Sequence, residues 1–197
     1  MSAYLYDNAI VNKLRGVIGD DRIHLMTTER AMEIIPRIDD DKFSLPLVTL
    51  SRTGWQILSD NNNHSARFEG DVAEVHPLND TLRIKRVQFI PMRIDYTLDV
   101  WTRTRVENDE IVRELFWFFL TSPTFKVTVP YDLEFEHNFN VFLEESVEDN
   151  SDINQQPNTG EYFRQSVRLY TDDAKLWKSS SRGPTSISIT LNNESIQ

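Results

Sequence analysis

Polar side chains in the last third of the sequence have the spacing of a calcium-binding loop. Such a loop takes ligands from its first, third, fifth and twelfth positions, which here are Asn150, Asp152, Asn154 and Glu161. The first position favours aspartate, however, and Gln155 occupies the position where the sharp turn needs glycine. The flanking segments have strand patterns instead of helix patterns. We therefore interpret residues 146–161 as a polar, flexible loop.

Acidic residues just before this loop are a second candidate for chemistry. The run consists of Glu144, Glu145, Glu148 and Asp149. Two carboxylates held together can act as general acid and general base, but a run of this kind also forms a solvated acidic rim. The sequence has no phosphate-binding loop, no dinucleotide fingerprint and no nucleophile elbow.

The histidines do not form a metal site by spacing. They are His24, His64, His76 and His137. None has a partner at the i, i+3 or i+4 spacing of helical metal sites. We therefore expect no catalytic, cofactor-binding or metal-binding residues, and a protein that is not an enzyme.

The most regular part of the chain is a strand that leads into a helix. Residues 93–103 alternate apolar and polar side chains, which predicts a strand with one buried face. Thr104 and Glu107 have the spacing of a capping box, and Asn108 is a second candidate cap. The apolar face of the helix that follows is formed by Ile111, Val112, Leu115, Phe116, Phe118 and Phe119.

Trp117 departs from the pattern of this helix. At ~100° per residue it lies about 100° or more from the centre of the apolar face, beside Glu110 and Arg113. Either a second layer of this chain buries Trp117, or another protein covers it.

The remaining segments predict an α+β fold, with a mainly antiparallel β-sheet packed by one long central helix and N-terminal helices. We expect one domain over residues 1–177, with an irregular insertion at 53–80. Residues 178–197 form a linker and a C-terminal extended arm with a possible added strand. Such a strand can pair with a sheet edge in its own subunit or in a neighbour.

The composition is that of an ordinary globular chain. It has 197 residues, a net charge of −10 and no cysteine, which excludes disulfides and thiolate metal sites. No apolar run approaches the length that crosses a bilayer, and the first residues lack a signal-peptide pattern. An acidic chain is also a poor candidate for nonspecific nucleic-acid binding.

Large aromatic residues at positions that the local pattern places outside indicate a subunit of an assembly. For each of them, a second core layer is the alternative. The candidate interface residues are Trp117, Arg113, Glu110, Trp101, Phe142, Trp55, Ile187, Ile189 and Leu191.

Three segments resemble virion proteins of tailed bacteriophages, most of all the tail terminator (tail completion) family. They are LPLVTLSR (45–52), IPMRIDYTLDVWTRTRVENDEIVRELFWFFL (90–120) and YFRQSVRLYTDDAKLW (162–177). The likeness covers about residues 1–177 and lies in the pattern and order of elements.

The resemblance implies a small α+β subunit that forms a six-fold ring at the head-proximal end of the tail tube. The ring ends tube polymerisation and joins the tail to the neck. Its partners are copies of itself, the tail tube protein, the sheath protein in contractile tails, and the head completion and connector proteins. DNA passes through without specific binding. The subunit is assembled in the host cytoplasm and resides in the virion.

Other functions remain open at this point. The extension after Lys178 departs from a minimal terminator and leaves open another neck or baseplate position. A small cytoplasmic enzyme would be supported by a deep pocket holding two carboxylates or a histidine pair. A monomeric adaptor or binding module would bury Trp117 and pair the C-terminal strand within its own chain.

Overall fold

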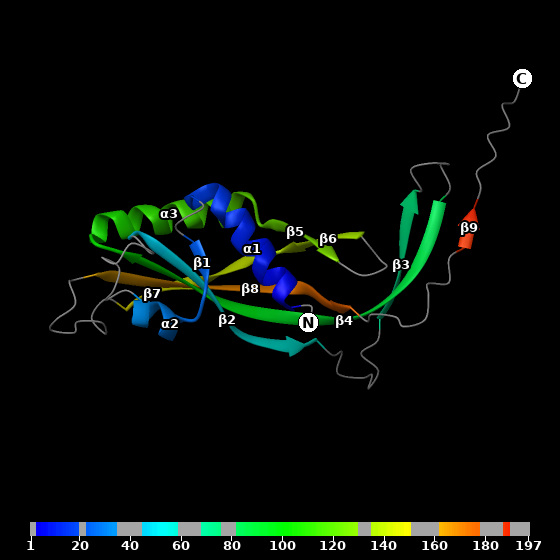
Figure 1. Cartoon of the computed structure of the whole chain (residues 1–197), viewed down its shortest axis with the longest axis horizontal. Helices are drawn as coiled ribbons and strands as arrows, with labels where there is room; N and C mark the ends of the chain where they lie inside the picture. The colour runs from blue at the N-terminus through cyan, green and yellow to red at the C-terminus, as the bar shows by residue number, and fades with distance from the viewer. Residues whose placement is uncertain are drawn as a thin grey trace, which may run out of the picture.

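Figure 1 shows a computed structural model, which describes residues 3–19, 23–34, 45–58, 68–75, 82–129, 135–150, 162–177 and 187–189. The elements are α1 (Ala3–Ile18), β1 (Ile23–Leu25), α2 (Thr28–Ile34), β2 (Leu47–Ile57), β3 (Phe68–Val75), β4 (Leu82–Thr102), α3 (Arg105–Thr121), β5 (Thr124–Val129), β6 (Phe135–Asn140), β7 (Phe142–Asp149), β8 (Phe163–Trp177) and β9 (Ile187–Ile189). The predicted α+β class with a mostly antiparallel sheet is confirmed.

The long strand β4 is the spine of the main sheet. The sheet has the order β1-β2-β4-β8-β7, and both β3 and β9 pair with the first half of β4. The register places β2 and then β3 along one side of β4, and β8 and then β9 along the other. All of these pairings are antiparallel except β1 with β2. Strands β5 and β6 form a separate hairpin.

One side of the sheet, which we call the helix side, carries α1 and α3 (Figure 1). Successive strand residues face opposite sides, so the even-numbered residues of β4 reach this side. Ile94, Tyr96 and Leu98 are buried there and join one core cluster with residues of α1 and α3. Their partners on β8 include Val167 and Leu169, which continue the same apolar layer.

Hydrogen bonds of the flanking residues fix both ends of helix α3. The Thr104 hydroxyl accepts a hydrogen bond from the Glu107 amide at 3.3 Å, which satisfies one of the free amides of the first turn. Asn108, the second candidate cap, is instead buried in the helix, and its amide donates to the Val100 carbonyl at 3.0 Å. At the other end the Ser122 amide donates to Phe118.

Trp101 lies on the opposite side of the sheet and is buried, so the prediction that it is exposed is wrong. This residue is 0% exposed, and it packs with Ala31 of α2 and with Leu47 of β2. Its indole Nε1 donates to the Thr49 hydroxyl at 3.2 Å. The strand pattern placed Trp101 outside because helix α2, distant in sequence, covers this side only in the folded chain. Trp101 is therefore part of a second core layer and is not available as an interface residue.

The insertion predicted at 53–80 is more regular than expected. Strand β2 continues to Ile57, and residues 68–75 form β3. Strand β7 likewise runs to Asp149, inside the segment predicted as a flexible loop. In β2 the local pattern is interrupted at Gly54, beside a register shift, and pairing with β4 continues on both sides of it.

Strands β3 and β9 flank the first half of β4 in a three-stranded arm that extends from the body (Figure 1). Residues 187–189 pair with Ile84, Arg83 and Leu82 of the same chain. Of the two alternatives for a C-terminal strand, residues 187–189 therefore show pairing within their own chain. Leu191 and the loop 151–161 lie outside the described residues.

Candidate subunit interface

The remaining aromatic candidates are exposed, as the sequence patterns predict. Trp117 is 64% exposed, Trp55 58% and Phe142 40%. Glu110 and Arg113 are exposed on the same helix as Trp117. These side chains lie on three different parts of the molecule, so the structure does not bring them into one site.

Helix α3 carries a row of exposed residues that we call the outer stripe. It consists of Val106, Glu110, Arg113, Trp117 and Leu120. The alternating steps of four and three residues place them on one side of a helix. Leu120 is 69% exposed, and Val106 is equally open to solvent. The sequence reading missed both residues, although their spacing from Trp117 is the signal that would have found them.

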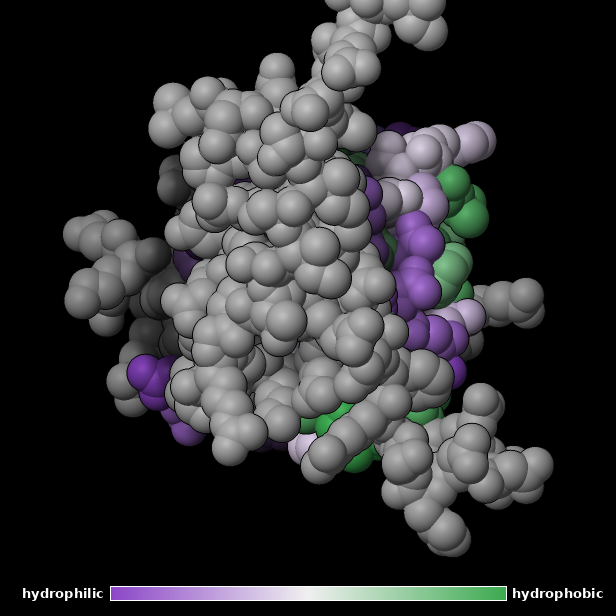
Figure 2. All heavy atoms as spheres, turned by 90° about the vertical axis from the view of Figure 1, so that its right-hand side faces the viewer, coloured by the Kyte–Doolittle hydropathy of each residue, from purple (hydrophilic) through white to green (hydrophobic). Residues whose placement is uncertain are grey.

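A second exposed group, which we call the arm base, consists of Trp55 and Ile57 near the end of β2. Trp55 pairs with Ile94 and Ile57 pairs with Met92, so both residues lie on the helix side of the sheet. Both side chains are nevertheless exposed, unlike the buried residues that they face. Figure 2 views the molecule from the end that carries the arm, where hydrophobic residues reach the surface beside a band of hydrophilic ones.

Phe142 belongs to a third group on the opposite side of the sheet. Its ring packs on Tyr170 with 5.5 Å between centroids, and the Arg93 guanidinium lies 4.2 Å from the centroid of the same tyrosine. Arg93 also forms ion pairs with Asp95 at 2.8 Å and with Glu144 at 3.5 Å. This group is a stack of ordered side chains, with the charge of Arg93 already compensated.

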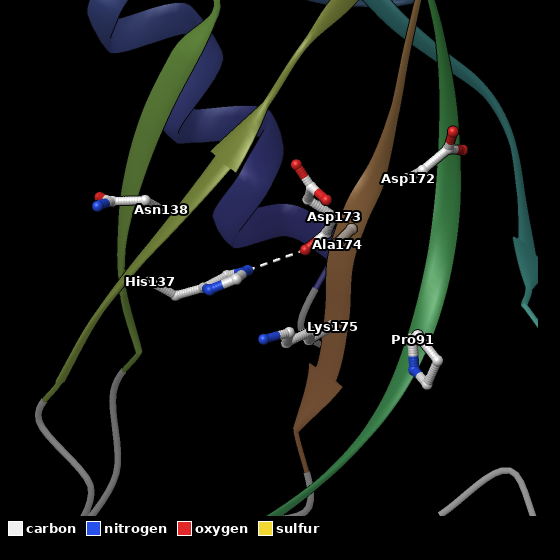
Figure 3. A pocket seen from close by; sticks show the side chains of 7 residues that line it. All are labelled: Pro91, His137, Asn138, Asp172, Asp173, Ala174 and Lys175. Carbon is white, nitrogen blue, oxygen red and sulfur yellow. Dashed lines mark hydrogen bonds between the residues drawn. The ribbon is translucent and has the colours of Figure 1, made fainter. Parts of the chain in front are cut away.

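A pocket of about 300 Å³ lies between β6 and β8, near the point where the arm meets the body (Figure 3). Its chemistry-bearing residues are His137, Asn138, Asp172, Asp173 and Lys175. Burial lowers the pKa of His137 and of Lys175. Two carboxylates and a histidine are the features that an enzyme site would require, so their geometry decides what this pocket can do.

The two carboxylates of the pocket do not converge. Register shifts opposite Arg93, so two β8 residues face one β4 residue, and Figure 3 shows Asp172 and Asp173 pointing to different sides of β8. Asp173 accepts from the Asn140 amide nitrogens at 3.1 and 2.9 Å. His137 Nε2 lies 2.9 Å from the Asp173 carbonyl. The polar groups of the pocket thus fasten β6 to β8.

The acidic run before the calcium-like loop is also divided. Glu144 contacts Arg93, whereas Glu148 forms an ion pair with Arg168 and Asp149 with Arg105. No two of these described carboxylates share a proton-transfer geometry. Each is instead placed against a separate arginine, which is the arrangement of a charged surface.

The most buried charged group was not predicted from the sequence. Asp99 is fully buried, and its Oδ1 atom accepts from Arg164 at 3.1 Å and from the Ser166 hydroxyl at 2.6 Å. Its Oδ2 atom accepts from Thr28 at 2.7 Å, which ties α2 to the sheet. The Arg164 guanidinium lies 4.8 Å from the centroid of Trp101. This cluster positions α2 over Trp101.

Comparisons with known proteins do not identify the chain. No protein-family model matches it, and no curated protein matches it. Within the described ranges, no helix is both long enough and apolar enough to span a membrane. In the same ranges, no cluster of three or more potential ligand side chains is placed to hold a metal ion.

Proposed function

We propose that this chain is a structural virion protein of a tailed phage, which forms a ring at the head-proximal end of the tail tube. The ring ends tube polymerisation and joins the tail to the neck. The observation that carries the proposal is the separation of the exposed apolar groups. The outer stripe and the arm base lie on different parts of the molecule, and neither is covered by the described chain.

Two separate apolar surfaces fit a ring better than a simple dimer. A two-fold dimer needs one patch that meets itself, whereas a ring of identical subunits needs two different patches that meet head to tail. Isolated exposed aromatics are ordinary on a monomer, but tryptophans set among other apolar residues are typical of interface centres. The exposure of Trp117 likewise favours a homo-oligomer over a monomeric binding module, in which Trp117 would be buried.

The charge of the chain supports the same function. A net charge of −10 suits a ring through which DNA passes without adhering, because like charges repel. In this proposal α3 is the central helix of the ring subunit. Residues 178–197 are its C-terminal extended arm, as distinct from the three-stranded arm described above. The tail tube protein, the sheath protein in contractile tails, and the head completion proteins are its partners in the virion.

Mass measurement by light scattering, with electron microscopy of the particles, tests the proposal. We expect closed rings of one size, formed either by the purified chain alone or upon addition of tail tubes. Tubes capped by the protein should stop elongating when further tube protein is added. A chain that remains a single copy under both conditions, and leaves tube growth unchanged, would contradict the proposed function.

A further inference from the structure

We infer that the outer stripe of α3 in one copy packs on the helix side of the sheet in the next copy, at the arm base. The inference rests on the proposed function in one respect, which is that the partner is a second copy of this chain. It goes further because it specifies which two surfaces meet.

Helix α3 is apolar on two sides but has a sheet on only one. Its inner side packs Ile111, Leu115 and Phe119 into the core. Its outer stripe presents Trp117 and Leu120, one turn apart, and no described element packs on them. A helix with apolar residues on both sides is suited to lie between two layers. The outer stripe therefore lacks a second layer.

The arm base is a sheet surface without a covering element. Trp55 and Ile57 continue the helix side of the sheet, directly opposite the buried residues Ile94 and Met92. Elsewhere on this side α1 and α3 pack on the strands, whereas Trp55 and Ile57 stay exposed. A sheet that is apolar on one face has to bury it against another element. The arm base therefore lacks a helix packed on top of it.

The two surfaces cannot meet within one molecule. In Figure 1, α1 lies between α3 and the arm, and the arm bends toward the side that carries the helices. Contact between a stripe at one end and a surface toward the other requires a second copy. The charges do not oppose this contact, because the exposed face of α3 carries both Glu110 and Arg113, whereas β2 has no acidic residue and its Arg52 is already paired with Asp7 at 3.3 Å.

The available area suits the centre of an interface. Aromatic side chains offer about 150–250 Å² each, so Trp117 and Trp55 at their observed exposures leave roughly 200–300 Å² of aromatic surface to be covered. Buried aromatic anchors of this kind usually dominate binding. The polar residues around them would form the rim.

A mixing experiment with two single variants tests the inference. Trp117→Glu disrupts the outer stripe and leaves the arm base intact, whereas Trp55→Glu does the reverse. Each variant alone should assemble about thirtyfold more weakly or worse, the effect expected for an interface hot spot. An equal mixture should form a complex of two copies and stop there, because only one intact pair of surfaces remains. Analytical ultracentrifugation measures both results.

Controls separate this inference from the proposed function. Val147→Glu changes an exposed apolar residue on β7, outside both surfaces, and should leave assembly unchanged. Circular dichroism should show that every variant is folded. If the unmodified chain assembles but neither variant is impaired, or the mixture forms no two-copy complex, the inference is wrong and the ring proposal survives. If the unmodified chain does not assemble, alone or on tail tubes, both are wrong.

A covalent test gives an independent readout. The chain has no cysteine, so introduced cysteines report only the pair under study. Mixing Leu120→Cys with Ile57→Cys under mild oxidation should give a disulfide-linked two-copy product on a gel. Leu120→Cys mixed with Val147→Cys is the matched control and should give none. Equal yields in the two mixtures would overturn the inference.

Discussion

The two halves of β4 follow the same alternation but differ in what covers them. The half that ends at Thr102 lies between α1 and α3 on one side and, at its end, α2 on the other. The half that begins at Leu82 pairs with β3 and β9 and, from Phe89 onward, with the end of β8. Alternation in a strand therefore indicates two faces, but elements elsewhere in the chain decide whether the chain itself buries them.

The largest difference should appear between a buried and an exposed tryptophan of the main sheet. Trp101→Ala removes a fully buried indole and should lower the free energy of unfolding by about 3–5 kcal/mol. Trp55→Ala, at the arm base, should change it by about 0.5 kcal/mol or less. Urea denaturation of both variants measures the difference. Equal losses would show that Trp55 supports the fold of its own chain.

This pair also shows what the sequence could and could not predict. The cap at Thr104 and the apolar face of α3 depend on neighbouring residues, so the local pattern predicts them. The exposure of Trp117 follows from the same helical spacing. The burial of Trp101 depends on α2, about seventy residues earlier in the chain, and no local pattern contains that contact. The Asp99 cluster was missed for the same reason.

A second comparison uses two aspartates on the same face of β4. Asp99→Ala leaves the Arg164 guanidinium without its buried partner, which should lower the free energy of unfolding by about 3–5 kcal/mol. Asp95→Ala removes a solvent-accessible ion pair with Arg93, which should cost about 1 kcal/mol or less. Thermal and urea unfolding measure both. A mild effect at Asp99 would mean that α2 stays in place without it.

The smallest effect concerns pH at the junction of the two halves. Burial lowers the pKa of His137 below its ordinary value of 6.5, so the unfolded chain takes up this proton first. Stability should therefore be full above pH 6.5 and decrease as the pH falls through the lowered pKa. Nearby Lys175 opposes protonation, whereas Asp173 and its carbonyl favour it.

His137→Gln should remove this part of the pH dependence in unfolding curves. Asp7 acts in the opposite direction, because burial raises its pKa, and the stability it contributes decreases as the pH rises through that raised value. The measurement is the difference in the free energy of unfolding between the unmodified chain and His137→Gln over pH 4.5–7.5. Parallel curves across this range would show that His137 does not contribute.

The extra residue of β8 opposite Arg93 has a consequence for how the chain can change in length. Without Asp173, the strand would pair with β4 in an unbroken ladder, since Thr171, Asp172 and Ala174 would then face Ile94, Arg93 and Met92 one for one. The sheet has no need of the additional residue. Its carboxylate holds Asn140 instead, so a one-codon deletion there would spare the ladder and remove this polar tie to the β5–β6 hairpin. This tie is thus encoded separately from strand pairing.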